Sequence, residues 1–396
     1  MLAIVTSHPI QYQAPLWREL ARAGVKFEVW FLTPHAVTAS YDREFARSFA
    51  WDVDLLEGYP HRFLAVRPGW RLDRFDGIRL ERRWRDELVE RGVTALWVEG
   101  WRFRTLWQAV AAAHRLHLPV WLRGESHDLG PERGWRRLAK RLVLGWLFRR
   151  VDHFLCIGSA NRQYYRNRHI PEDRLHSAPY CVDNERFAVA ARALEPRREE
   201  LRRQWAIAPG SFCLLFCGKL IGKKRPLDLV EAVRRHPLPG GRPVHLLFVG
   251  DGELAEPLRQ ALAAPGAPPG TLAGFLNQSE IVAAFVAADC LVLPSDFGET
   301  WGLVVNEALA AGRPAIVSDH CGCAADLAAP LGTGLVFPCG DLPALAAAIS
   351  RVASRPPPGD LIREISERHA PRRTVETILR LQSGDQPANK REDHER

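Results

Sequence analysis

Short apolar segments of strand length recur along the whole chain, each separated from the next by a stretch long enough for a helix. They are 2–6, 26–31, 95–98, 119–122 and 153–158 in the first half, and 212–218, 244–250, 290–295 and 314–318 in the second. Strands that alternate with helices form parallel sheets with helices on both faces. Because 396 residues exceed the usual size of one domain, we expect two doubly wound α/β domains.

A change of composition marks the predicted boundary between them. Residues 188–210 are charged and contain proline, and the chain ends in a polar stretch. We therefore predict a first domain over 1–190, a linker over 191–210, a second domain over 211–368, and a C-terminal helix with a disordered tail over 369–396.

The apolar runs and the cysteines of the sequence bear on where the protein is located and on whether it binds a metal. No apolar run approaches the roughly 18 residues of a membrane-spanning helix, and the first residues lack the basic and apolar parts of a secretory signal. We therefore expect a cytoplasmic protein. Most of the eight cysteines lie in apolar runs, and only Cys321 and Cys323 are closely spaced, so we expect no metal site.

The net charge of +8 falls entirely within residues 1–190. Such a surface attracts anionic partners. A strong excess of arginine over lysine is the competing explanation, since the base composition of a genome alone can produce it. Both interpretations stay open at this point.

The segment 291–318 carries the most chemistry. A buried strand is followed by a loop with Glu299, and a helix then begins near Trp301 and Gly302 and ends at Gly312. Ligands of open α/β sheets bind at the carboxyl ends of strands, where this loop lies. The free amides and the positive end of the helix dipole near Leu303 suit a phosphate.

Two carboxylates flank this predicted anion site. Glu299 precedes the helix, and Glu307 lies four residues beyond Leu303, on the same helix face. Carboxylates accept hydrogen bonds from hydroxyls and repel phosphates, so a phosphorylated sugar is the ligand that this combination favours. A helix with an acidic cap and a solvated Glu307 is the structural alternative.

A cluster of cations follows the strand at 212–218. Lys219, Lys223, Lys224 and Arg225 lie within seven residues, although the chain has only six lysines. We expect Lys219 and Lys224 to hold a diphosphate, and Lys223 and Arg225 to be exposed. No GxxxxGK[ST] motif is present, which argues against an ATPase or GTPase.

Two further strand ends carry glycines. Gly250 follows the apolar run in LFVGDGEL, residues 247–254, and Phe275 and Leu276 follow the glycine of AGFLNQSEI, residues 273–281. Glycines here let a flat ring approach the backbone, although ordinary strand-to-helix turns have the same composition.

These four motifs occur in an order that resembles the C-terminal domain of family 4 retaining glycosyltransferases, which have the GT-B fold. The order is G-K-L-x-x-K-K, F-V-G-D-G, G-F-L, and L-P-S-x-x-x-E-T-W-G-L-V-V-N-E-A-L-A-x-G-x-P, within residues 212 to about 350. Two glutamates separated by seven residues make the last motif specific.

The resemblance implies a role for each matching residue. Glu299 would contact donor-sugar hydroxyls, Glu307 the ribose, and the amides of Trp301, Gly302 and Leu303 the sugar and diphosphate. Lys219 and Lys224 would neutralise the leaving diphosphate, although the family usually has Arg at the position of Lys219. The backbone of Phe275 and Leu276 would meet the base.

The first half matches this family less closely. Residues 8–20 stand where the family often has a glycine-rich loop; glycine is absent here, and His8 or Gln11 would face the cleft instead. His127, in a loop after a strand, stands where the family has a histidine that touches the donor sugar. A solvent-exposed loop histidine is the alternative.

Residues 133–150 combine seven cations with leucines and tryptophans at roughly helical spacing. Such a helix would rest on anionic lipid, at the inner face of the membrane, and would suit a lipid-linked acceptor. A core-packing helix with a solvated basic face is the alternative.

We thus expect a glycosyltransferase that moves a sugar from a nucleotide-diphosphate sugar to a glycan, lipid-linked or small-molecule acceptor. The resemblance implies retention of anomeric configuration, and we expect catalysis without metal or other cofactor, since lysines and helix amides face the departing charge. The alternatives are a nucleotide-sugar epimerase, a non-catalytic nucleotide-sugar-binding protein, a manganese enzyme using Asp52 and Asp54, and a nucleic-acid-binding protein. We expect no nucleic-acid partner.

Overall fold

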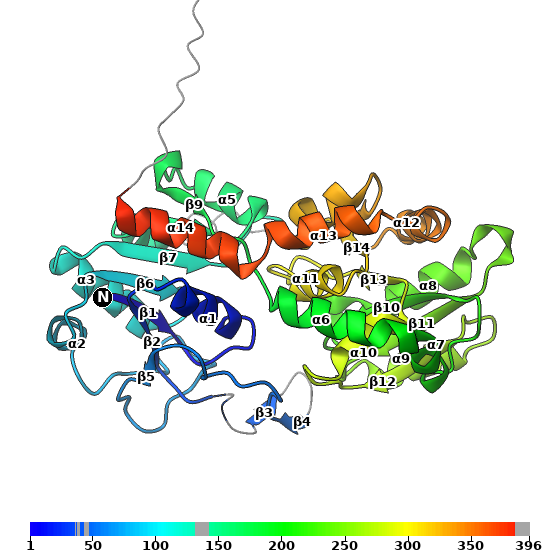
Figure 1. Ribbon diagram of the computed structural model, residues 1–396, viewed down its shortest axis with the longest axis horizontal. Coiled ribbons are helices and arrows are strands. Elements are labelled where there is room, and N and C mark those ends of the chain that lie inside the picture. The colour runs from blue at the N-terminus through cyan, green and yellow to red at the C-terminus, as the bar shows by residue number, and fades with distance from the viewer. Residues whose placement is uncertain (36, 38–39, 43–46, 131–141, 385–396) are drawn as a thin grey trace, which may run out of the picture.

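The computed structural model describes residues 1–384 except 36, 38–39, 43–46 and 131–141, and consists of two α/β halves placed side by side (Figure 1). Each half is built on a parallel sheet with helices on both faces, which confirms the predicted fold class. Within the described residues, no helix is long and apolar enough to cross a bilayer.

The first sheet has seven parallel strands in the order β5-β2-β1-β6-β7-β8-β9. Their bounds are β1 Leu2–Thr6, β2 Phe27–Phe31, β5 His61–Phe63, β6 Ala95–Glu99, β7 Val120–Gly124, β8 His153–Cys156 and β9 Leu175–Ser177. β1 is entirely buried, as expected for a parallel strand that is covered on both faces. A separate antiparallel pair, β3 Ser40–Asp42 and β4 Arg47–Phe49, follows β2.

Two groups of helices cover this sheet. One apolar layer packs beneath α1 (Ala14–Arg22) and α14 (Pro371–Ser383), and the other beneath α2 (Trp84–Glu90), α3 (Arg104–Arg115), α5 (Ser159–Arg166) and the helical residues 142–148.

The second sheet has six parallel strands in the order β12-β11-β10-β13-β14-β15. Their bounds are β10 Phe212–Cys217, β11 Val244–Val249, β12 Gly270–Gly274, β13 Cys290–Leu293, β14 Ala315–Ser318 and β15 Val336–Phe337. The surrounding helices are α6 Asn184–Leu194, α7 Arg198–Gln204, α8 Pro226–Arg235, α9 Ala255–Ala263, α10 Ile281–Ala287, α11 Leu303–Ala310, α12 Leu342–Ser354 and α13 Gly359–Arg368.

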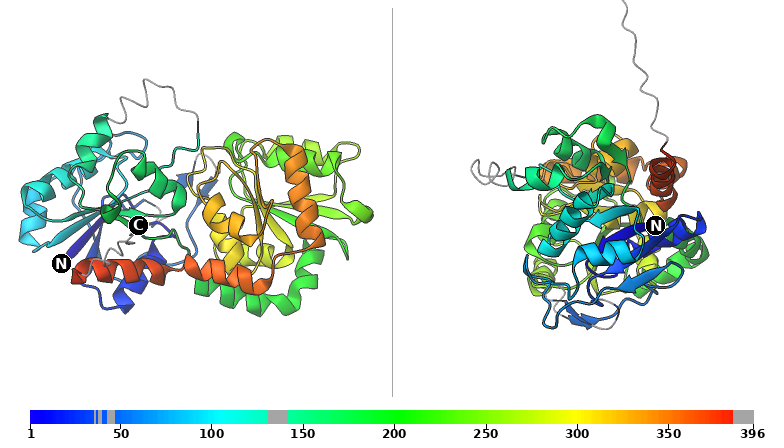
Figure 2. Two further views of the ribbon diagram at one scale, coloured as in Figure 1. Left: turned by 90° about the horizontal axis from the view of Figure 1, so that it is seen from above. Right: turned by 90° about the vertical axis from the view of Figure 1, so that its left-hand side faces the viewer.

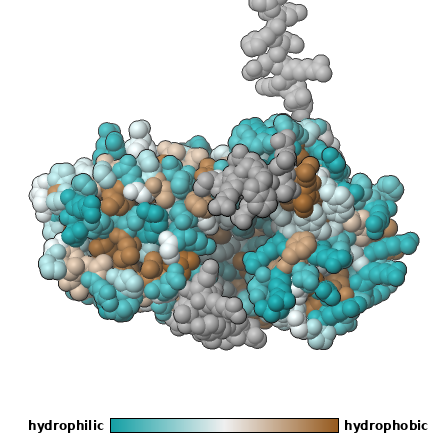
Figure 3. Space-filling view, turned by 180° about the vertical axis from the view of Figure 1, so that it is seen from behind, coloured by the Kyte–Doolittle hydropathy of each residue, from teal (hydrophilic) through white to brown (hydrophobic). Residues whose placement is uncertain are grey.

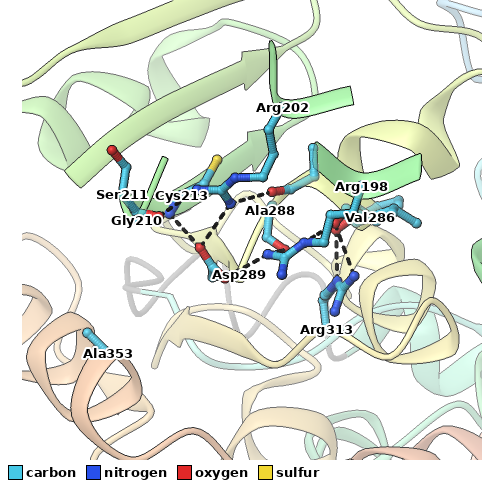
Figure 4. Close-up of polar contacts among 12 residues, drawn as sticks. Arg198, Arg202, Gly210, Ser211, Cys213, Val286, Ala288, Asp289, Arg313 and Ala353 are labelled. Carbon is cyan, nitrogen blue, oxygen red and sulfur yellow. Dashed lines mark hydrogen bonds and ion pairs between the residues drawn. The ribbon is translucent and has the colours of Figure 1, made fainter. Parts of the chain in front are cut away.

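The segment expected as a linker, 191–210, is largely helical and is anchored to the second half. Arg198 and Arg202 of α7 both bind the carboxylate of Asp289, at 2.7 and 3.4 Å, and donate to carbonyls of the segment that precedes β13 (Figure 4). Asp289 also accepts from the N–H of Cys213 at the start of β10, at 2.7 Å. α7 is therefore fixed at the amino end of this sheet.

The chain returns to the first half at its C-terminal end. α13 and α14 run almost in line along one side of the molecule, so that α13 lies on the second half and α14 on the first (Figure 2). In α14, Thr374 and Thr377 donate to the carbonyls of Pro179 and Ser177 at 3.3 and 2.7 Å. Residues 385–396, which include most of the predicted tail, lie outside the described residues.

Candidate active site

The carboxyl ends of β10, β11 and β12 meet through glycine backbone. The N–H of Gly250 donates to the carbonyl of Gly274 at 2.8 Å, and the N–H of Gly218 donates to that of Val249 at 2.9 Å. A Cβ atom on Gly250 would lie 1.9 Å from the Gly218 oxygen, and the φ of Gly250 is +132°. Only glycine fits here, because the Gly218 carbonyl occupies the space that a side chain would need.

Lys224 and Glu299 form an ion pair across the ends of the neighbouring strands β10 and β13. Both side chains are about 15% exposed. The hydroxyl of Ser295 donates to the same carboxylate oxygen at 3.4 Å. The sequence predicted the two residues as separate ligand contacts; the structure brings them together, so a diphosphate that binds Lys224 competes with a carboxylate already in place.

Helix α11 begins directly after this pair, with Gly302 as its N-cap. Gly302 has a φ of +104°, and an added Cβ would lie 2.6 Å from Leu293, so this turn also requires glycine. The first intrahelical bond runs from Val305 N–H to the Gly302 carbonyl. The N–H groups of Leu303 and Val304 lie in the first turn of α11, where backbone N–H groups have no partner within the helix.

The expected ligand contact of Trp301 involves its main-chain amide, and its side chain has a separate structural role. It is 2% exposed, and its indole N–H donates to Asn306 at 2.8 Å. Its ring lies against Gly158, where a Cβ would approach it to 2.3 Å. Asn306 in turn donates to the carbonyl of Tyr180 at 3.0 Å. Trp301 thus anchors α11 to the first half.

Glu307 lies on α11 and is 2% exposed. Burial raises the pKa of this carboxyl to about 7, although the amide of Gln278, at 3.5 Å, and the charge of Arg186 act in the opposite direction. Arg186 holds Gln278 with bonds of 2.7 and 2.6 Å to its carbonyl and amide oxygens. Sequence reasoning missed Gln278, because its role depends on α6 lying beside the loop after β12.

The first half contributes His127 to the Glu299 loop. The N–H of Leu129 donates to its Nδ1 at 3.2 Å, so the proton of the neutral ring is on Nε2, which donates to the carbonyl of Glu299 at 3.1 Å. Glu125 lies beside it, accepting from the hydroxyl of Thr300 at 3.3 Å and from that of Tyr180 at 2.6 Å. The loop after β7 therefore contacts the loop after β13 directly.

His8 and Gln11 lie in the loop after β1, and both are half-buried. Burial, followed by the charges of His35 and Arg102, lowers the pKa of His8 to about 4, so this imidazole is neutral at physiological pH. Tyr12, which the sequence did not single out, reaches the second half and packs against its apolar core. Burial and then the charge of Glu307 raise the pKa of its hydroxyl.

The remaining predicted residues lie around this centre. Lys219 is half-buried just after β10, and Phe275 and Leu276 are half-buried just after β12. Lys223 is exposed as expected, whereas the Arg225 side chain is only 35% exposed and pairs with Asp228 at 2.7 Å. On the face shown in Figure 3, a hollow lies between the two halves.

The second half of the chain matches a known family. Residues 197–369 match the family model described as glycosyl transferases group 1. The Lys224 loop, Gly250, the Glu299 loop and Glu307 all lie within the matched residues.

Curated relatives of this chain are similar over part of their length. A GDP-mannose-dependent alpha-mannosyltransferase of Mycobacterium tuberculosis is 32% identical over 207 residues, which cover 52% of this chain and 49% of that protein. A D-inositol 3-phosphate glycosyltransferase of Pseudarthrobacter chlorophenolicus is 33% identical over 162 residues, covering 37% and 34%. The chain thus aligns with half or less of the length of these two relatives.

A solved structure extends the similarity of fold to both halves of the chain. Anabaena HepE, crystallised with UDP and glucose, superposes with a TM-score of 0.68 at 14% identity, over 97% of this chain and 99% of that one. The GT-B fold that the sequence motifs implied is therefore confirmed.

Asp52 and Asp54, the alternative manganese pair, are both bound to other protein groups. Asp52 accepts from the N–H and hydroxyl of Ser279, and Asp54 accepts from the N–H groups of Leu56 and Glu57 at 2.8 Å. Among the described residues, no group of three or more histidine, cysteine or acidic side chains is arranged to hold a metal.

A large recess lies apart from these residues. It has a volume of about 960 Å³ and is lined by α1, α6, α11, α13 and α14, on the side of the connection between the two halves. Arginines line it in greater number than carboxylates. It contains none of the residues that the sequence predicted for the site.

Proposed function

We propose that this protein is a glycosyltransferase that transfers a sugar from a nucleotide-diphosphate sugar to a glycan, lipid-linked or small-molecule acceptor. One observation supports this most: Lys224, Glu299 and the start of α11 converge at the ends of β10 and β13, within the residues that match the group 1 family model. Cations and free amides meet a diphosphate at such an edge, and carboxylates meet hydroxyls.

The reaction breaks the anomeric C–O bond to the diphosphate and forms a bond from the anomeric carbon to an acceptor hydroxyl oxygen. Negative charge grows on the departing diphosphate, whose oxygen takes up the proton of that hydroxyl. In this proposal, Lys219, Lys224 and the N–H groups of Leu303 and Val304 stabilise that charge. Glu299 leaves its ion pair to accept from sugar hydroxyls, and His127 approaches the sugar from the first half. The matching motifs favour family 4 and retention of configuration.

We further propose that no divalent metal is needed, because protein cations already face the leaving group. Turnover should then be unchanged after dialysis against EDTA. A loss of turnover that Mn²⁺ or Mg²⁺ restores would contradict this part of the proposal.

Stabilisation of the folded protein by a bound donor gives the first test of the proposed function. A panel of UDP-, GDP-, ADP- and dTDP-sugars is screened for a rise in melting temperature, and stabilising donors are then incubated with and without acceptors. We expect stabilisation by at least one family of donors and transfer to an acceptor. Epimerisation without acceptor would favour the alternative enzyme, and binding without turnover would favour a nucleotide-sugar-binding protein.

We also propose peripheral contact with an anionic membrane, by an exposed apolar patch on the first half. It comprises Phe75, Leu142, Val143 and Trp146, which are 52, 70, 58 and 41% exposed. Trp107 joins Phe75 to Trp146, with ring centroids 6.1 and 5.8 Å apart, and the Arg150 guanidinium lies 3.9 Å from the Trp146 ring. Apolar side chains beside arginines suit the interface of anionic lipid. Of the predicted basic helix, residues 133–141 lie outside the described residues.

Vesicle co-sedimentation tests this contact. We expect binding to vesicles containing phosphatidylglycerol but not to pure phosphatidylcholine, and weaker binding by Trp146→Ala than by Val189→Ala, a change at an exposed apolar residue on α6. Equal sedimentation of the two variants would contradict the assignment of this patch.

A further inference from the structure

A short segment of the first half crosses to the second half at the loop that follows β12. In this segment, residues 50–53, the carbonyl of Ala50 accepts from Asn277 Nδ2 at 2.9 Å. The carboxylate of Asp52 accepts from the N–H of Ser279 at 3.2 and 3.1 Å, and from its hydroxyl. Residues more than 220 positions apart in the chain are thus joined by several polar contacts.

The same crossing segment brings an aromatic ring to that loop. The ring of Trp51 lies 6.4 Å from the ring of Phe275, at an interplanar angle of 44°. Trp51 is half-buried, as is Phe275. Phe275 and Leu276 are the residues whose backbone is proposed to meet the nucleotide base, so Trp51 is an aromatic side chain from the other half beside the base position.

The loop is also held by Arg186 of α6. Gln278 is bound by Arg186 at 2.6 and 2.7 Å and donates to Glu307 at 3.5 Å. A cavity of about 140 Å³ lies between Gln278, Val53 and Tyr12. Asn277 and Ser279 of this loop therefore contact the crossing segment, and Gln278 between them contacts Glu307, the residue proposed to bind the ribose.

A second contact between an aspartate and a serine joins the two halves, and here the second half supplies the aspartate. Asp326 of the second half accepts from the N–H of Ser159 at 3.2 and 2.9 Å, and from its hydroxyl, at the start of α5 in the first half. Each half thus supplies an aspartate to a serine near the start of a helix in the other. The crossing by residues 50–53 is one of two matched contacts that hold the halves together.

We propose that Trp51 forms part of the base site, as an aromatic wall that the first half contributes, and that the bonds from Asp52 to Ser279 position it. The inference rests on the proposed function, because it takes the ligand to be a nucleoside diphosphate. Its consequence is that recognition of the base depends on both halves of the molecule, whereas the diphosphate contacts Lys219, Lys224 and α11 of the second half alone.

The test compares two ligands that differ by the nucleoside. Calorimetry measures the affinity of wild type and Trp51→Ala for the nucleoside diphosphate of the stabilising donor and for inorganic pyrophosphate. We expect Trp51→Ala to weaken nucleoside diphosphate binding about tenfold, since removal of one aromatic ring stacked on a base has about this effect. Pyrophosphate affinity should be unchanged, and a purely structural loss would lower both.

Trp205→Ala is the matched control, because Trp205 is also half-buried but lies beside Thr271, near the amino end of β12. It should leave both affinities unchanged. Trp51→Phe should retain most of the nucleoside diphosphate affinity.

The positioning role of Asp52 is tested by a double-mutant cycle. Asp52→Ala and Ser279→Ala should each weaken nucleoside diphosphate binding several-fold, and the double variant should be no weaker than the worse single variant. Unchanged nucleoside diphosphate affinity in Trp51→Ala, while wild type binds, would overturn this inference alone. Failure of wild type to bind any nucleoside diphosphate would overturn the proposed function instead.

Discussion

At the scale of single residues, the site depends on charges that are kept out of water. Lys224 and Glu299 neutralise one another, whereas Glu307 is buried and accepts a long bond from Gln278. Burial raises the pKa of Glu307 to about 7, so at neutral pH a ligand that donates hydroxyls to this carboxyl favours its ionised form. A ribose with two hydroxyls is such a ligand.

Glu307 should make the stability of the free protein depend on pH. Its folded pKa lies above its unfolded value, so the folded state binds more protons between pH 4.5 and about 7, and stability falls as pH rises through this window. Glu307→Gln removes this dependence. As the pH is raised from 5 to 8, the free energy of unfolding of this variant should therefore increase by roughly 2 to 3 kcal/mol relative to that of wild type. Thermal unfolding at both pH values measures it; a constant difference would argue against the burial account.

Because Lys224 and Glu299 form an ion pair, a substitution at either residue should change how the protein binds a diphosphate. Lys224→Ala should weaken nucleoside diphosphate binding by about 1.5 to 3 kcal/mol, the range for a charged hydrogen bond. Glu299→Gln should abolish transfer but strengthen diphosphate binding, because Lys224 no longer has a competing carboxylate. Calorimetry and a transfer assay on the same preparations measure both effects. Normal turnover in Glu299→Gln would remove this residue from the mechanism.

At the scale of elements, the sequence predicted the strands better than the contacts between them. Continuous apolar runs such as 212–218 and 244–250 predicted β10 and β11 within one residue, since a strand buried on both faces has no polar positions. β5, β9 and β15 were missed because two or three residues carry no periodic signal. Glu299 and Lys224 could be expected to lie close because parallel strands end at one edge.

Gly250 provides the test at this scale, since the edge of the sheet depends on its missing side chain. Gly250→Ala should destabilise the second half by more than about 3 kcal/mol, because the added methyl meets the Gly218 carbonyl and φ is strained. Gly266→Ala is the control: φ is also positive, at +76°, but nothing lies within 4 Å, and the cost should be about 1 kcal/mol. Equal melting temperatures for the two variants would contradict the packing argument.

At the scale of the whole molecule, the halves are joined by contacts that no local pattern revealed. Trp301, Tyr12, Asp52 and Asp326 all reach the other half. Their partners follow from how the two sheets face one another, which strand and helix patterns do not determine. The sequence therefore predicted the second-half residues of the candidate site and left most of the contacts between the halves unpredicted.

Helix α14 packs against the first half and should contribute to its stability. Ile378 is fully buried in the apolar layer beneath α1, whereas its neighbour Leu379 is 42% exposed. Ile378→Ala should cost about 2 to 5 kcal/mol, and Leu379→Ala less than about 0.5 kcal/mol. Denaturant unfolding of both variants measures the difference, and similar midpoints would mean that α14 does not stabilise the first half.

The central claim is that a nucleotide-diphosphate sugar binds between these halves with its diphosphate at the ends of β10 and β13. A crystal structure with the nucleoside diphosphate of the stabilising donor tests it directly. We predict diphosphate oxygens on Lys224 and on the N–H groups of Leu303 and Val304, and ribose hydroxyls on Glu307. A nucleotide bound elsewhere, with the Lys224 and Glu299 pair intact and these N–H groups facing solvent, would contradict it.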